Sequence, residues 1–341
     1  MPTISAAELN ETVTAALVAA GASLENAAIV ADHLVAANLS GVDTHGVWHL
    51  VGYVQALHDG LIDGVASPTI LRESQVSALV SGHWTFGHVA AKFATERGIE
   101  RALETGVAAV GLVQCHHIGR LGHYPELAAE RGVLCQVWAG GYSEEAPATV
   151  PFGGRARLLH TNPISMGFPA GAEPRMMFDF ATTAMSGVKI DEARRRGDRL
   201  PPGAIVDKTG QPSTDPNDFY DGGGHIPFGG HKGYGLNMAA EFFGRILTGA
   251  NNYADPDRAG PIMRNQGVTF ILIREDVFTS SADYQARADE MERRTRAIPP
   301  AAGFASVLVP GDPERNARQA RTAAGIPIDD ELWSRIQALP R

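Results

Sequence analysis

The stretch from Cys115 to Tyr124 concentrates side chains that can move protons and bind anions. It contains adjacent imidazoles at His116 and His117 and a guanidinium at Arg120. Histidine titrates near neutral pH, and a guanidinium pairs with a carboxylate or a phosphate. Because side chains alternate along a continuing strand, we expect only one of the two imidazoles to face a site and the other to be structural. The stretch predicts proton transfer beside an anionic ligand; the alternatives are hydrogen-bonded structural histidines and a solvated arginine.

A second polar group lies in a break between two expected helices. The sequence DTHG at residues 43–46 brings together a carboxylate, a hydroxyl and the imidazole of His45. His49 and Tyr53 follow four and eight positions later, which would place them on one helical face with His45. The shared face of His45, His49 and Tyr53 predicts that these side chains take part in the same proton transfer. The alternative is a capping turn, with the acid or the hydroxyl at a helix N-terminus.

Three further segments carry polar groups at the ends of expected elements. Residues 229–235 (GGHKGYG) open the strongest predicted helix, where free N–H groups and Lys232 would form an anion site, unless this is a flexible entry loop. Residues 179–183 (DFATT) end a strand, with Asp179 either orienting an imidazole or capping the next helix. Residues 160–163 (HTNP) supply more donors and acceptors, or form a turn.

Several common signatures are missing from the sequence. It has no Gly-x-Gly-x-x-Gly after a strand and no phosphate-binding P-loop motif. It also lacks His-x-His, His-Glu-x-x-His and Cys-x-x-Cys, so we expect no metal site. Cys115 and Cys135 lie in apolar runs and are expected to be buried, reduced thiols. A dinucleotide would therefore have to bind without the usual Rossmann fingerprint.

The composition narrows the partners that the chain can have. Its 341 residues are 44% hydrophobic and 20% charged, as in an ordinary globular protein. The formal net charge of −9 argues against a nucleic-acid partner, but not against a small anion bound in a basic cleft. We see no signal peptide and no apolar run of about 18 residues, and therefore expect a cytoplasmic protein without a membrane span.

Hydrophobic periodicity predicts an α/β protein with a helical unit at its N-terminus. The expected helices cover residues 5–18, 23–38, 47–57, 87–103, 125–130, 231–247 and 283–294, and most of the tail 313–341. The expected strands cover residues 76–80, 107–113, 133–137, 176–180, 268–273 and 306–309, and residues 147–174 should be irregular or short-stranded. We interpret residues 1–65 as a helical unit that packs with residues 300–341. Residues 66–299 then form a cofactor- and substrate-binding core, with a surface excursion near 194–228.

Six segments taken in order resemble the malate/L-lactate dehydrogenase family, whose fold is not Rossmann-like. They are Asp43-Thr44-His45-Gly46, His117-Ile118-Gly119, Thr161-Asn162-Pro163, residues 179–183, residues 230–235 and Val309-Pro310-Gly311-Asp312. Residues 116–122 (HHIGRLG) look most like the hydroxycarboxylate dehydrogenase B branch. The resemblance spans nearly the whole chain.

This resemblance implies an NAD(P)-dependent oxidoreductase with a mixed, non-Rossmann β-sheet, in which the subunits pair as homodimers. Of the two cofactors, we expect NADH. It makes His117 the catalytic acid/base, places His45 at the same reaction centre, and suggests Thr44, His49, Tyr53 and Arg120 as substrate-binding residues. The residues expected to bind the cofactor are His45, Gly119, Arg120, Leu121, Thr161, Asn162, Asp179, Phe180, Ala181, Thr182, Thr183, Lys189, His231, Lys232, Asn265, Gly311, Asp312, Pro313 and Glu314.

One departure from the family pattern concerns the substrate. Many members carry an arginine that holds the substrate carboxylate at the position of His49. Here the carboxylate would meet Arg120 or a backbone site, or the substrate differs. We expect hydride transfer between nicotinamide C4 and C2 of a 2-oxo/2-hydroxy acid. The alternatives are a cyclic imino-acid reductase of the same family, a metal-dependent hydrolase or lyase, and a non-catalytic ligand-binding protein.

Overall fold

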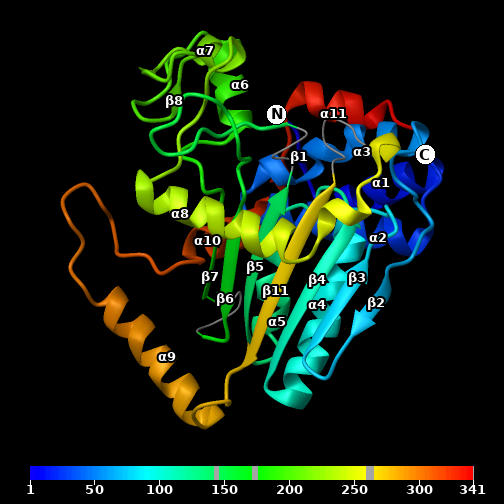
Figure 1. The fold of residues 1–341 in the computed structure, drawn as a ribbon, viewed down its shortest axis with the longest axis vertical. Coiled ribbons are helices and arrows are strands. Elements are labelled where there is room, and N and C mark those ends of the chain that lie inside the picture. The colour runs from blue at the N-terminus through cyan, green and yellow to red at the C-terminus, as the bar shows by residue number, and fades with distance from the viewer. Residues whose placement is uncertain (142–145, 171–175, 259–264, 341) are drawn as a thin grey trace.

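A seven-stranded mixed sheet forms the centre of the molecule (Figure 1). The computed structural model describes residues 1–141, 146–170, 176–258 and 265–340. The strand order is β2-β3-β4-β11-β5-β6-β7, with β3 and β4 parallel and every other pair antiparallel. The strands are β2 (Thr69–Glu73), β3 (Ser77–Ser81), β4 (Val107–Cys115), β5 (Val133–Gly141), β6 (Ile164–Phe168), β7 (Met176–Phe180) and β11 (Gln266–Arg274). The expected mixed α/β fold is confirmed.

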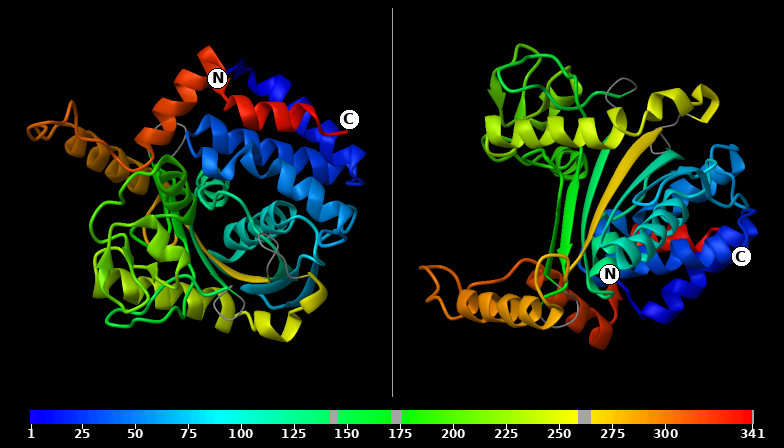
Figure 2. Two further views of the ribbon diagram at one scale, coloured as in Figure 1. Left: turned by 90° about the horizontal axis from the view of Figure 1, so that it is seen from above. Right: turned by 60° about the horizontal axis from the view of Figure 1, so that its bottom comes forward.

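Helices cover both faces of this sheet (Figure 2). On one face lie α4 (Gly87–Thr105) and α5 (His123–Ala129), whose apolar side chains share a buried core with the sheet. On the other lie α8 (His231–Ala240) and its π-helical continuation η3 (Glu241–Ile246). A Cβ added to Gly140 of β5 would lie 2.5 Å from the carbonyl oxygen of Ala240, so a glycine is needed for this close approach.

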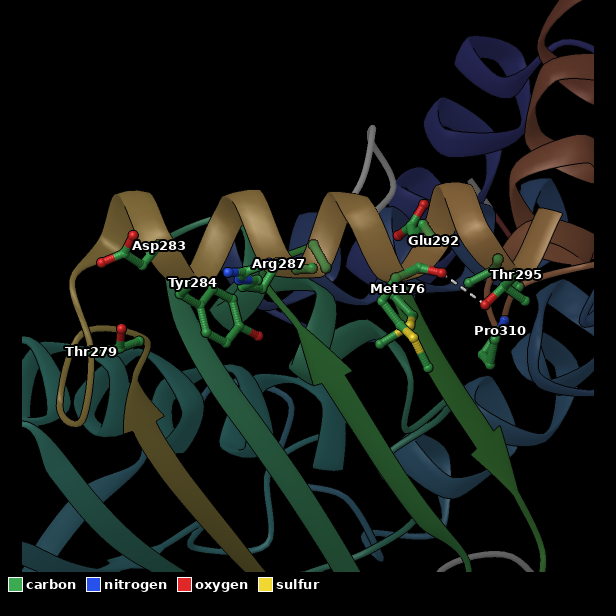
Figure 3. A pocket seen from close by; sticks show the side chains of 12 residues that line it. Met176, Thr279, Asp283, Tyr284, Arg287, Glu292, Thr295 and Pro310 are labelled. Carbon is green, nitrogen blue, oxygen red and sulfur yellow. Dashed lines mark hydrogen bonds between the residues drawn. The ribbon is translucent and has the colours of Figure 1, made fainter. Parts of the chain in front are cut away.

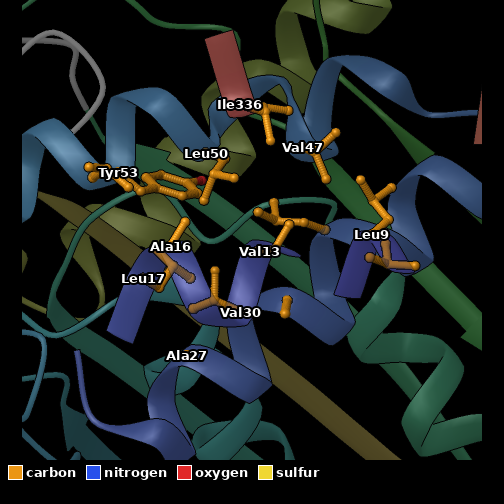
Figure 4. Close-up of a cluster of buried hydrophobic side chains, with 14 of the residues drawn as sticks. Leu9, Val13, Ala16, Leu17, Ala27, Val30, Val47, Leu50, Tyr53 and Ile336 are labelled. Carbon is orange, nitrogen blue, oxygen red and sulfur yellow. The ribbon is translucent and has the colours of Figure 1, made fainter. Parts of the chain in front are cut away.

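The N-terminal helices and the C-terminal segment form one layer with a shared apolar cluster (Figure 4). The layer contains β1 (Thr3–Ile4), α1 (Ala6–Ala19), α2 (Leu24–Leu39), the 3-10 turns η1 (Asp43–His45) and η2 (Val47–His49), α3 (Leu50–His58), α10 (Asp312–Ala324), β12 (Ile326–Pro327) and α11 (Asp330–Gln337). Strands β1 and β12 pair antiparallel. Ser5 and Ser23 cap α1 and α2, each accepting a backbone N–H at 3.1 Å.

Two segments stand away from the main sheet. The excursion predicted near residues 194–228 belongs to a unit that begins earlier, at Gly187. It consists of α6 (Gly187–Arg196), β8 (Ile205–Val206), β9 (Pro212–Ser213), α7 (Pro216–Tyr220) and β10 (Gly224–His225), with a three-stranded sheet and a small core of its own. Helix α9 (Ser281–Arg296) extends outward from the body in Figure 1. Glu292 is the buried residue of α9. The short turns η4 (Ala250–Tyr253) and η5 (Pro256–Arg258) precede β11.

Some predicted elements differ from the structure. Residues 306–309 form no strand: the segment runs beside the edge of β7, where one backbone bond joins Met177 N to Pro310 O, and Pro310 has no N–H to continue a ladder. The predicted helix 47–57 begins at Leu50, after two 3-10 turns, and the predicted helix 231–247 is α-helical up to Ala240. Strand β2 was missed because all five of its residues are exposed. No helix of the described chain is both long and apolar enough to cross a membrane.

Candidate active site

A cleft of about 550 Å³ brings together most of the polar segments found in the sequence. It lies between the loop after β4, the ends of β5 and β7, the turn at residues 42–49, and the first turn of α6. Its lining includes the predicted site residues Thr44, His45, His49, His117, Gly119, Arg120, Leu121, Thr161, Asn162, Asp179, Phe180, Ala181, Lys189 and Glu314. Segments far apart in the sequence thus meet at one site.

The loop after β4 separates its two imidazoles as the alternation predicts. His116 is fully buried, its ring lies 5.0 Å from that of Trp84, and its Nε2 is 2.9 Å from the carbonyl oxygen of Leu61. His117 lines the cleft instead. Gly119 has a φ of +72°, and an added Cβ would lie 2.4 Å from Nε2 of His33, so conformation and space both require glycine there.

His117 is held by a tyrosine hydroxyl and surrounded by rings. The hydroxyl of Tyr53 lies 2.8 Å from His117 Nδ1, and the ring centroids of His49 and His45 lie 4.6 and 5.6 Å from that of His117. Burial lowers the pKa of His117 well below its usual value, that of His45 to about 4 and that of His49 to about 3. All three imidazoles are therefore neutral at pH 7, each with one N–H and one lone pair.

The turn that carries His45 is fixed by the side chain of Asn38 on α2. Asn38 Oδ1 accepts the backbone N–H of Val47 at 2.9 Å, and its Nδ2 donates to Asp43 at 2.7 Å. A Cβ on Gly46 would lie 2.1 Å from Asn38 Oδ1, so only glycine fits between them. Asp43 also accepts two bonds from Arg321 of α10, at 2.6 and 2.9 Å. It therefore positions the turn rather than taking part in the chemistry.

Arg120 does not offer the free guanidinium that the sequence suggests. Its side chain is 1% exposed, and its Nη1 and Nη2 donate to Glu126 at 3.1 and 2.8 Å. Glu126 also accepts from Arg318 of α10 at 2.6 Å. The backbone N–H of Arg120 donates to His33 Nε2 at 2.9 Å. Its place at the cleft is therefore structural, because its charge is already paired.

Asp179 has a role that neither sequence interpretation anticipated. Its carboxylate accepts the backbone N–H of Gly122 at 2.8 Å, so it anchors the loop after β4 rather than an imidazole or a helix end. Burial raises the pKa of this carboxyl although Arg120 lies close enough to oppose the rise. The loop is thus held from β7 as well as from α2.

The other predicted residues lie outside the lining of the cleft. Tyr53 sits behind His117, and Thr182 turns inward to donate to the carbonyl oxygens of residues 161 and 162 at 2.9 and 3.0 Å. His231 and Lys232 are exposed at the start of α8, because that helix end faces outward. The remainder are held by local contacts: Thr183 by Met185 O, Asn265 by Ala250 O, and Asp312, with Gly311 and Pro313 beside it, by Arg296 and Arg315.

Sequence reasoning missed three histidines that pack around the site. His33 and His88 lie on the buried faces of α2 and α4, with ring centroids 4.6 Å apart. His225 lines the cleft from the excursion. A histidine within an apolar helical face gives little signal in a sequence, because the same pattern describes an ordinary core position. Both cysteines are buried free thiols, as expected.

A larger cavity, of about 750 Å³, lies under α9 (Figure 3). Tyr284, Arg287 and Glu292 reach it from the helix, and Met176 and Pro310 lie opposite them. It contains no histidine among its lining residues, whereas the smaller cleft has five. Chemistry rather than volume therefore marks the smaller cleft as the candidate active site. Within the described ranges, no group of three His, Cys, Asp or Glu residues could hold a metal ion.

The family model described as malate/L-lactate dehydrogenase matches residues 4–337. The chain belongs to the malate/L-lactate dehydrogenase family. It is 34% identical to L-sulfolactate dehydrogenase of Methanothermobacter thermautotrophicus, over 93% of this chain and 90% of that one. It is 32% identical to hydroxycarboxylate dehydrogenase B of Escherichia coli O157:H7, over 93% and 87%. The crystal structure of delta1-piperideine-2-carboxylate reductase from Pseudomonas syringae pvar. tomato superposes with a TM-score of 0.86 at 29% identity, over 99% and 100%.

Membership of the malate/L-lactate dehydrogenase family makes the chain an oxidoreductase that uses a nicotinamide cofactor. The resemblance drawn from six segments is confirmed, and the hydrolase, lyase and non-catalytic alternatives are not supported. The cleft suits a polar cofactor, since His49 Nδ1 and Gln266 Oε1 are buried in its wall with no hydrogen-bond partner in the described chain. Gly119, Gly140 and Gly141 expose backbone along the same wall.

Proposed function

We propose that the cleft catalyses hydride transfer between a nicotinamide cofactor and a 2-oxo/2-hydroxy carboxylic acid. The observation that carries the proposal is the neutral, buried imidazole of His117, which is oriented by Tyr53 and faces the cleft between His45 and His49. The cofactor supplies the hydride chemistry, and the residues of the protein supply orientation and proton transfer.

His117 is the acid/base of this proposal. In the oxidation direction, its Nδ1–H donates to the hydroxyl oxygen of Tyr53, which leaves Nε2 free to accept the proton of the substrate hydroxyl. In the reduction direction, the imidazolium returns that proton to the carbonyl oxygen. The substrate carboxylate stabilises the imidazolium because an opposite charge nearby raises a histidine pKa. His45, held at 3.1 Å by the hydroxyl of Thr44, is the second ring at the reaction centre.

We assign the carboxylate of the substrate to Thr44 and His49. Both line the cleft beside His117, and His49 Nδ1 has no partner within the described ranges. Arg120 is already paired with Glu126, so no free guanidinium among the described lining residues serves this purpose. Because these side chains are neutral, the negative charge near His117 comes from the substrate carboxylate, and this charge favours protonation of His117.

The cofactor is proposed to lie along Gly119, Leu121, Thr161, Asn162, residues 179–181, Lys189 and Glu314, which all line the cleft. We favour NADH over NADPH. Binding of a 2′-phosphate commonly uses an arginine, and the one arginine in the described lining is engaged by Glu126.

An absorbance assay at the nicotinamide band tests this function. Purified enzyme is offered a panel of 2-oxo acids with NADH and with NADPH, and His117→Ala serves as the variant. We expect turnover to fall about 10²–10⁴-fold in the variant while NADH binding is retained. Turnover near the wild-type rate in folded His117→Ala protein, or no reduction of any 2-oxo acid or imine, contradicts the proposal.

Reduction of a cyclic imino acid is the second candidate. It is favoured by the structural likeness to delta1-piperideine-2-carboxylate reductase, which extends over 99% of this chain. The same assay separates the two, because cyclic imines are offered in parallel with 2-oxo acids. If the enzyme prefers imines, His117 protonates the ring nitrogen of the imine instead of a carbonyl oxygen.

We propose that two copies of the chain pair through α9 and the segment that follows it. Helix α9 has no buried apolar residue among its 16, although most helices are stabilised by burying one face. Phe278 and Phe304, which precede and follow the helix in the chain, are 91% and 71% exposed, and Met291 on the helix is 66% exposed and lines the cavity under α9. Light scattering should report a dimer and a monomeric Phe278→Ser/Phe304→Ser variant. A wild-type monomer, or a dimer unaffected by the change, contradicts this.

A cytoplasmic location stays a prediction.

A further inference from the structure

The end of the cleft formed by the excursion has a polar cluster that the proton chemistry does not use. It consists of the first turn of α6, at residues 186–189, together with His225 and Phe219. All of them line the cleft that contains His117. We define this cluster as the α6 subsite.

The backbone of α6 gives the subsite a positive end. The helix spans ten residues, and its cap Ser186 accepts only the N–H of Lys189, at 3.4 Å. In the described chain the N–H groups of Gly187 and Val188 have no acceptor, as expected for the first residues of a helix. Such a terminus carries a partial positive charge and favours an anion.

Lys189 adds a full charge to this end of the cleft. Its side chain is exposed at the cleft and forms no ion pair with the described part of the chain. The nearest acid on the same helix, Asp191, is engaged elsewhere, by Arg195 at 3.1 Å and by the hydroxyl of Tyr220 at 3.4 Å. The charge of Lys189 is therefore available to a ligand.

His225 points independently to a ligand at the same place. Its side chain is 2% exposed, and its Nδ1 has no hydrogen-bond partner within the described residues. The ring lies 4.6 Å from that of Phe219, and a Cβ added to Gly187 would lie 3.9 Å from Nε2, so Nε2 is the ring nitrogen that faces the first turn of α6. A ligand at the first turn of α6 would give the Nε2–H of this buried ring a hydrogen-bond acceptor that the described chain does not supply.

We propose that the α6 subsite binds a phosphate or carboxylate group. The N–H groups of Gly187 and Val188 and the ammonium of Lys189 contact its oxygens, and the imidazole of His225 donates to it from the buried side. The proposal rests on the proposed function only for the identity of the molecule that carries the group, either the phosphate of the nicotinamide nucleotide or a second acid group on the substrate.

A titration with inorganic phosphate, followed by phosphorus NMR, tests the subsite without catalysis. The variants are Lys189→Gln and His225→Phe, which keeps a ring against Phe219. Lys208→Gln is the matched control, because Lys208 is exposed in the same excursion but paired with Asp221. We expect saturable binding that weakens about tenfold in Lys189→Gln and His225→Phe, is unchanged in the control, and falls with ionic strength. An adventitious ion only, with no saturable binding or with equal binding in Lys189→Gln, overturns the proposal.

Two further measurements on Lys189→Gln identify the source of the anion. Weaker NADH binding with an unchanged KM for the 2-oxo acid assigns the subsite to the phosphate of the cofactor, and the reverse assigns it to the substrate. An effect on neither overturns the proposal. If no 2-oxo acid or imine is reduced but phosphate binding still depends on Lys189, the proposed function fails while the subsite stands.

Discussion

Replacing Glu126 by glutamine tests whether the loop that carries His117 depends on a buried ion network. Glu126 is 5% exposed and accepts bonds from Arg120 at 2.8 and 3.1 Å and from Arg318 at 2.6 Å. Glutamine keeps the shape but removes the charge, so the buried guanidinium of Arg120 loses its bidentate partner. Removal of one member of a buried pair costs about 3–5 kcal/mol of unfolding free energy.

The pKa of Glu126 gives a second route to the same magnitude. Burial alone would raise it, but Arg120 and Arg318 outweigh burial and lower it from 4.5 to about 2. At about 1.4 kcal/mol for each pKa unit, this corresponds to about 3 kcal/mol. Because the folded pKa is depressed, the contribution is complete above pH about 5 and is lost as the pH falls toward 2.

Urea unfolding at pH 7 and at pH 3, followed by circular dichroism, measures both effects. We expect Glu126→Gln to lose about 3–5 kcal/mol at pH 7 and clearly less at pH 3. Glu96→Gln is the control, because its pair with Lys92 is partly exposed and should contribute at most about 1 kcal/mol. A Glu126→Gln protein as stable as wild type at pH 7, or a loss that does not shrink in acid, refutes the reasoning.

Three further predictions concern the site. Tyr53→Phe removes the hydroxyl on His117 Nδ1, so kcat should fall about tenfold with NADH affinity retained; an unchanged kcat and pH profile in steady-state assays would count against this role. Gly119→Ala should cost more than about 2 kcal/mol by urea unfolding, whereas Gly197→Ala, with a similar φ of +74° but open space, should cost about 1 kcal/mol; equal losses would contradict the steric argument. Because burial depresses the pKa of His117, kcat/KM for hydroxy-acid oxidation should stay level as the pH falls through 6.5, and a decline centred there would show an ordinary imidazole.

Local sequence signals predicted the elements that depend on local interactions. The predicted strand at residues 107–113 is part of β4, and the helices predicted over residues 5–18 and 23–38 match α1 and α2. The alternation of His116 and His117 also predicted that only one of the two rings faces the cleft, and the family resemblance indicated that this ring is His117. These features depend on neighbours a few residues away, which the sequence shows directly.

Long-range contacts decided what the sequence could not predict. The sequence suggested that Arg120 would be free, but its partner Glu126 lies on the next helix and is shared with Arg318. The basic pair His231-Lys232 has the composition of an anion site, yet its helix end faces outward. The ring of His33 supports the loop from α2, 87 positions away from Arg120. None of these relations leaves a local pattern.

The ion pairs that α10 forms with earlier segments have a consequence for the synthesis of the chain. Arg318 and Arg321 bind Glu126 and Asp43, which precede them by 192 and 278 positions. Translation proceeds at about 5–20 residues per second, so Arg318 and Arg321 are synthesised roughly 10–60 s after Glu126 and Asp43, the acids that they bind. A nascent chain that ends before α10 already contains every strand of the main sheet, but it lacks these two arginines, so we expect its reaction centre to be incompletely held. We therefore expect the chain to become catalytically active only after α10 has been translated.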